Sequence, residues 1–119
     1  MIADRAIVLF YNVLDTCDEV LGFLEGKTYE DYAIDNLLRA AVEMGLIRMG
    51  RDLKTALRFD PKLVLEINNT SRFISKSSFL TYNYNKISNE NVWNFSRRYL
   101  PSLRSEIEST LADPNRTTK

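Results

Sequence analysis

The chain has 119 residues, 45% hydrophobic and 27% charged, which fits one globular domain. Sixteen Lys and Arg residues balance sixteen Asp and Glu residues, so no overall field attracts the protein to nucleic acid or acidic membranes. The sequence has no histidine and one cysteine, which excludes Ser-His-Asp and Cys-His catalysis and zinc sites of nitrogen and sulfur ligands.

The cellular compartment is indicated by the single cysteine and by the N-terminus. Cys17 allows no internal disulfide and favours a reducing compartment. The N-terminus lacks the charged start, apolar core and small-residue cleavage site of a secretion signal, and no apolar run approaches a membrane span. We therefore expect a cytoplasmic protein without membrane contact.

The first half of the chain has helical periodicity. Apolar residues recur at steps of three and four over residues 3–25, which predicts an amphipathic helix that Gly26 is placed to stop. Cys17 lies on the apolar stripe of this helix, so buried packing is favoured over reactivity.

A second helical stretch is expected from Thr28, a good N-cap, to about Leu57. Gly45 and Gly50 weaken this stretch locally. Each glycine either lets another helix approach closely or marks a bend.

Two further helices are expected in the second half. Asp60-Pro61 is a start signal for a third long helix, which weakens through the polar run 75–78. Ser88 caps the last helix, which Pro101 is expected to kink because proline removes a donor and clashes with the preceding turn.

These elements predict the fold class. No strand-like alternation is present, so the chain is expected to be all-α, an antiparallel bundle of four main helices. A single domain is expected over residues 1–111, followed by a frayed polar tail over residues 112–119.

Seven of the thirteen aromatic residues fall between Phe73 and Tyr99. Four of them are expected to fill the core: Phe73, Phe79, Trp93 and Phe95. Tyr82 and Tyr84 differ, because they lie in a polar connection between helices.

The run from Tyr84 to Trp93, followed by Leu100-Pro101-Ser102-Leu103, resembles the C-terminal signature of HepT-like proteins, a family in the HEPN group of helical bundles. That signature has a tyrosine, then Asp and Ile, then Val-Trp and Leu-Pro-x-Leu at this spacing. The usual acidic residue before Leu-Pro is Tyr99 here, preceded by two arginines. The resemblance covers roughly residues 5–111.

The resemblance implies the toxin half of a two-gene toxin–antitoxin module. Members resemble metal-independent ribonucleases that need no cofactor, and two motif copies meet in a homodimer. The implied partner is a minimal nucleotidyltransferase antitoxin, which adenylylates the motif tyrosine. We accordingly expect a homodimer through the helices that flank the segment 76–84.

The family's ribonuclease motif is Arg, four to six residues, His, any residue, Tyr. Tyr84 matches the tyrosine and is the implied modification site, and Tyr82 occupies the histidine position. Lys76 is the only basic residue in the arginine window, and Arg72 is the nearest arginine. The implied catalytic residues are therefore Lys76, Tyr82 and Tyr84, and the implied RNA phosphate contacts are Arg72 and Lys76.

The missing histidine weakens the expected chemistry. A phenol with a pKa of ~10 is a poor base near neutrality, and losing an acid–base group costs ~10² to 10⁴ in rate. We expect weak or lost ribonuclease activity. The alternative is a non-catalytic helical module that binds a nucleotide, RNA or protein partner.

A third hypothesis treats the acidic cluster of Asp15, Asp18 and Glu19 as a metal site. A solvated acidic face is favoured for these residues, because charge runs are usually surface. No metal is therefore expected.

Overall fold

The computed structural model describes residues 4–62, 73–74 and 88–112, and the structural statements below concern these residues. They form three long helices and one short one: α1 (Asp4–Leu24), α2 (Tyr29–Ile34), α3 (Asn36–Phe59) and α6 (Asn89–Ala112). No strand occurs among them, and the predicted all-α class is confirmed. In the described part of the chain, no helix combines the length and hydropathy that a transmembrane span needs.

Helix α1 forms where the apolar periodicity predicts it. Its buried stripe points at the rest of the bundle and includes Phe10, Val13, Cys17 and Val20. Gly26 follows with a φ of 74°, the left-handed conformation that glycine adopts without steric cost. The predicted stop is confirmed.

The predicted single helix from Thr28 to Leu57 is wrong, because the structure divides it into α2 and α3. Thr28 does cap α2: its Oγ1 accepts from the Asp31 N–H at 3.1 Å, and the Asp31 carboxylate accepts from the Thr28 N–H at 3.0 Å. The break comes at Asp35, whose backbone is extended and whose Oδ1 accepts from the Leu38 N–H at 3.0 Å. An aspartate here caps a new helix instead of continuing the old one.

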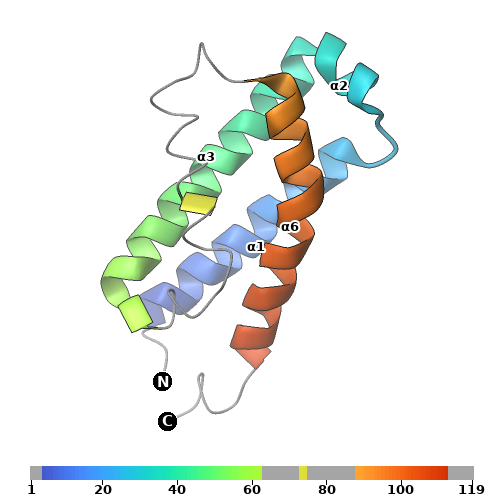
Figure 1. The fold of residues 1–119 in the computed structure, drawn as a ribbon. Coiled ribbons are helices and arrows are strands. Elements are labelled where there is room, and N and C mark those ends of the chain that lie inside the picture. The colour runs from blue at the N-terminus through green and yellow to red at the C-terminus, as the bar shows by residue number, and fades with distance from the viewer. Residues whose placement is uncertain (1–3, 63–72, 75–87, 113–119) are drawn as a thin grey trace.

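Helices α1 and α3 run antiparallel (Figure 1). They approach closely at Gly45. A Cβ atom at Gly45 would lie 2.4 Å from Cγ2 of Val20 and 3.7 Å from Cγ2 of Thr16. Of the two alternatives for this glycine, the structure shows the close approach, since α3 continues through Gly45 to Phe59.

Helix α6 closes the described part of the bundle. Ser88 Oγ accepts from the Asn91 N–H at 3.3 Å, which confirms Ser88 as the cap. The helix continues through Pro101, and a kink there stays a prediction. Most of the predicted third helix and residues 113–119 of the predicted tail lie outside the described residues, although residues 61–62 and 73–74 are helical.

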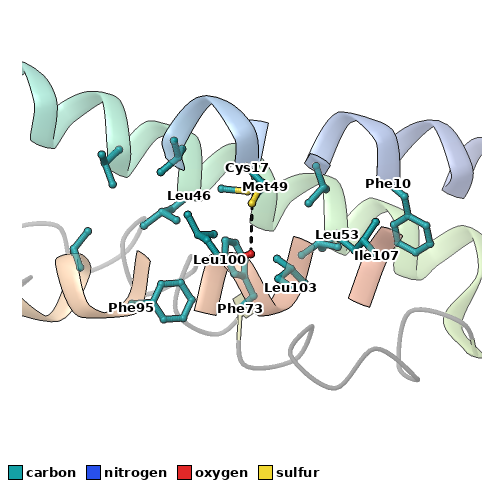
Figure 2. Close-up of a cluster of buried hydrophobic side chains, with 14 of the residues drawn as sticks. Phe10, Cys17, Leu46, Met49, Leu53, Phe73, Phe95, Leu100, Leu103 and Ile107 are labelled. Carbon is teal, nitrogen blue, oxygen red and sulfur yellow. Dashed lines mark hydrogen bonds between the residues drawn. The ribbon is translucent and has the colours of Figure 1, made fainter. Parts of the chain in front are cut away.

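A single buried cluster joins α1, α3 and α6 (Figure 2). Ten of its members are labelled in the figure: Phe10, Cys17, Leu46, Met49, Leu53, Phe73, Phe95, Leu100, Leu103 and Ile107. The Cys17 thiol donates to the carbonyl oxygen of Leu100 at 3.6 Å, so one polar contact ties α1 to α6 inside this apolar core.

Candidate functional site

The four residues that the resemblance assigns to a site, Arg72, Lys76, Tyr82 and Tyr84, lie outside the described residues. Their mutual geometry stays a prediction. The nearest described neighbours in the sequence are residues 73–74 and Ser88. Phe73 packs on α6 and Ser88 caps it, so α6 is the described element closest to the predicted site.

Phe73 connects the predicted site region to α6. Its side chain is 1% exposed and its ring centroid lies 5.2 Å from that of Phe95, which in turn lies 5.2 Å from Tyr99. In the sequence, Arg72 directly precedes Phe73 and Lys76 follows it by three positions. The core positions predicted for Phe73 and Phe95 are confirmed, whereas Phe79 lies outside the described residues.

The apolar residues of the HepT-like signature are packing residues. Val92, Leu100 and Leu103 are all buried on the inner face of α6. Trp93 is half-buried and contacts two rings of α2, with centroids 6.2 Å from Tyr29 and 5.5 Å from Tyr32. The Val-Trp and Leu-Pro-x-Leu elements therefore hold α6 against its neighbours, and their apolar side chains carry no reactive group.

Two exposed arginines stack on these aromatic rings. The Arg97 guanidinium carbon lies 5.3 Å from the Trp93 ring centroid, and that of Arg98 lies 5.9 Å from the Tyr99 centroid. Among the described residues, no carboxylate pairs with either guanidinium. A stacked guanidinium keeps its N–H edges available for a phosphate. The spacing of Arg97 four residues after Trp93 was a readable signal for the first contact.

Two buried polar side chains lack a hydrogen-bond partner within the described part of the chain. They are Glu43 of α3, 8% exposed, through Oε1, and Ser96 of α6, fully buried, through Oγ. Such groups are costly and often mark a functional position. Sequence reasoning missed Glu43, although Leu46 and Gly50, three and seven residues later, are apolar and share its side of the helix.

A polar pocket of about 480 Å³ opens between α1 and α3. It is lined by Asn12, Asp15, Thr16, Glu19, Arg48, Arg51 and Asp52. Carboxylates of α1 face guanidinium groups of α3 across it. Partial burial raises the pKa of the Asp52 carboxyl, and the charges of Arg48 and Arg51 act in the opposite direction.

The acidic cluster on α1 is divided between two partners. The Asp18 carboxylate lies 2.5 Å from Nε of Arg104, and that of Glu19 lies 4.0 Å from Nη1 of Arg48. The part of the chain that the structure describes holds no group of three or more His, Cys, Asp or Glu residues that could bind a metal ion. Asp18 and Glu19 therefore form ion pairs at the surface of the bundle, as the sequence favoured over a metal site.

The Cys17 thiol is poorly reactive at neutral pH. Burial, and to a smaller extent the charge of Asp18, raises the pKa of its thiol to about 12. The thiolate, which is the nucleophilic form, is therefore nearly absent at neutral pH.

Comparison of the chain with protein-family models, with curated proteins and with solved structures gave no match. The class that the fold defines is an all-α protein with an arginine-bearing aromatic cluster on its last helix. The narrower HepT-like resemblance rests on the sequence motifs.

Proposed function

We propose that this chain is the HepT-like component of a toxin–antitoxin module, with weak or lost ribonuclease activity, and that a partner nucleotidyltransferase modifies it at Tyr84. The observation that carries the proposal is the organisation of α6. The Val-Trp and Leu-Pro-x-Leu elements of the signature both lie on this helix, with Val92, Leu100 and Leu103 buried. Arg97 and Arg98 remain exposed beside them.

The proposed chemistry follows from the residues available. RNA cleavage needs one group to take the 2′-hydroxyl proton and another to stabilise the phosphorane. Arginines supply phosphate binding and charge stabilisation, but the sequence has no histidine for proton transfer. Adenylylation of Tyr84 would add a phosphodiester charge and an adenine close to Lys76 in the sequence, and would oppose RNA binding by repulsion and bulk.

The modification is tested by incubating the full chain with ATP and any nucleotidyltransferase encoded by an adjacent gene, followed by intact mass measurement. We expect the wild type and Tyr82→Phe to gain one adenylyl group, and Tyr84→Phe to gain none. Modification that persists in Tyr84→Phe would move the acceptor elsewhere. No modification of any variant would contradict this part of the proposal.

The second candidate is a non-catalytic RNA-binding module, favoured by the absence of histidine together with the two stacked arginines. Anisotropy with a labelled single-stranded RNA separates the candidates when combined with a cleavage assay. We expect Arg97→Ala and Arg98→Ala each to weaken RNA binding. Each should also reduce, by about 1, the magnitude of the slope of log K for binding against log salt concentration. Arg58→Ala, an exposed arginine on α3, is the matched control. RNA binding without cleavage would identify the chain as a non-catalytic binding module. Robust metal-independent cleavage would identify it as a ribonuclease.

A further inference from the structure

One end of the bundle is strongly acidic, although the whole chain is formally neutral. This end comprises residues 15–38, which are the second half of α1, the connection to α2, α2 itself and the first turn of α3 (Figure 1). It has one basic residue, Lys27, and a formal charge of −6, with seven acidic residues: Asp15, Asp18, Glu19, Glu25, Glu30, Asp31 and Asp35. Residues 39–62, by contrast, hold six basic and three acidic residues. The charges of this neutral chain are therefore unevenly distributed.

Ion pairs within the chain leave most of this negative charge in place. Arg48 and Arg104 each pair with one carboxylate of the acidic end, and their two charges reduce its formal charge from −6 to −4. The carboxylates of Asp31 and Asp35 accept backbone N–H groups, which satisfies hydrogen bonds without cancelling charge. The acidic end therefore favours a cationic partner and repels an anionic one such as RNA.

The same end exposes large apolar side chains. Leu37 is 81% exposed and Met44, seven residues later on the same side of α3, is 55% exposed. Phe23 of α1 is also exposed. Its level follows from the packing of Gly45 on Val20, because Phe23 lies one turn beyond Val20 toward the start of α3. Phe23 is therefore level with the turn between the two apolar residues of α3.

These three side chains form a contiguous surface. Glu19 and Arg48 pair across 4.0 Å, and Phe23 and Met44 are the residues four positions away from them toward the acidic end. Positions four apart share a side of a helix, so Phe23 and Met44 face the same way as this ion pair. Residues 40–41, in the α3 turn before Met44, are both alanine. The charged pocket thus borders one edge of the apolar surface and does not divide it.

We propose that Phe23, Leu37 and Met44, with the carboxylates around them, form a docking site for a basic amphipathic helix of another protein. Such a helix docks through apolar anchors at i, i+3, i+4 and i+7, a length that matches the two turns, about 10 Å, from Leu37 to Met44. Its Lys and Arg residues would lie against the carboxylates of the acidic end. The inference does not depend on the proposed function, because it uses neither the segment 76–84 nor the arginines of α6.

The probe is a labelled helical peptide of about 14 residues, with leucines along one side and lysines along the other. Its binding to the full chain is followed by fluorescence anisotropy, and the control is the same peptide with glutamate in place of each lysine. We expect saturable binding of the lysine peptide with a Kd below about 100 µM, and at least about tenfold weaker binding of the glutamate peptide. Absence of binding by the lysine peptide, or equal binding of both peptides, would overturn the proposal.

Uncharged substitutions locate the site on the molecule. Leu37→Gln and Met44→Gln should each raise the Kd of the lysine peptide at least about fivefold, because each removes an apolar anchor. Val8→Gln is the matched control, since Val8 is 59% exposed near the other end of α1, and it should leave the Kd unchanged. All three side chains are exposed, so the helical circular dichroism should not change. Unchanged binding in both Leu37→Gln and Met44→Gln, or an equal loss in Val8→Gln, would exclude this site.

Charge reversals test the acidic surround. Glu25 and Glu30 are exposed and belong to no ion pair among the described residues. Glu25→Lys and Glu30→Lys should each raise the Kd of the lysine peptide at least about threefold. Glu108→Lys makes the same change of net charge near the end of α6, and it should change the Kd less than about twofold. Equal effects of all three reversals would show that net charge alone attracts the peptide, and would refute the docking site.

Discussion

Gly45→Ala tests the close approach of α1 and α3. The new Cβ would lie 2.4 Å from Cγ2 of Val20, a separation that requires one of the helices or the valine to move. Val20 is 1% exposed and β-branched, so it has one strongly preferred rotamer in a helix and little room to rotate. Overpacking of this kind costs about 1–3 kcal/mol.

The helical propensity of alanine acts in the opposite direction and must be separated from the clash. Replacing glycine by alanine inside a helix gains about 1 kcal/mol, so the expected net loss for Gly45→Ala is about 0–2 kcal/mol. Gly22→Ala is the matched control, since nothing lies within 4 Å of its added Cβ. It should stabilise the protein by about 1 kcal/mol, and the difference between the two variants isolates the clash.

The assay is urea unfolding followed by helical circular dichroism at one fixed protein concentration, because association would also shift the midpoint. The Gly45→Ala clash should be relieved when Val20→Ala is combined with it, giving a coupling energy of about 1–3 kcal/mol in a double-mutant cycle. Equal stabilisation by Gly22→Ala and Gly45→Ala, or a cycle without coupling, would refute the close approach described for α1 and α3.

Three further outcomes are expected. Glu43→Met should raise the free energy of unfolding by about 1–3 kcal/mol in urea, because it removes a buried carboxylate oxygen without a described partner; a loss would show that the oxygen is paired. Asp35→Ala should lower the free energy of unfolding by about 1 kcal/mol because α3 loses its cap, whereas Asp15→Ala, an exposed aspartate within α1, should change it little. The folded pKa of Cys17 is raised to about 12 from 9.0, so the unfolded chain loses its thiol proton first and stability falls between those pH values by about 1.4 kcal/mol per unit. Cys17→Ala should lack this contribution, and identical pH profiles for the two proteins would exclude it.

The features that the sequence predicts correctly are those whose partners are close in the chain. Thr28 and Ser88 cap helices with groups only three residues away, and Gly26 needs no partner at all. Asp35 carries the same capping chemistry, but it lies between Ile34 and Leu37 in a stretch with continuous helical periodicity. Periodicity alone therefore hides the break.

The candidate site was less predictable, because its contacts join distant segments. The pocket between α1 and α3 depends on the register of two antiparallel helices, which no local pattern specifies. The burial of Glu43 depends likewise on what packs against α3. In the sequence, Arg97 stands out only as a departure from the family pattern, because its contact with Trp93 depends on α2 holding that ring.

The break at Asp35 has a mechanical consequence for the far end of the chain. A straight helix beginning at Tyr29 would extend along the axis of α3 at 1.5 Å per residue. With the break, α2 instead lies where Tyr29 and Tyr32 contact the Trp93 ring of α6. The Trp93 ring in turn supports Arg97. A continuous series of contacts therefore links the α2–α3 break at Asp35, through the rings of α2 and Trp93, to a surface arginine more than sixty residues away in the sequence.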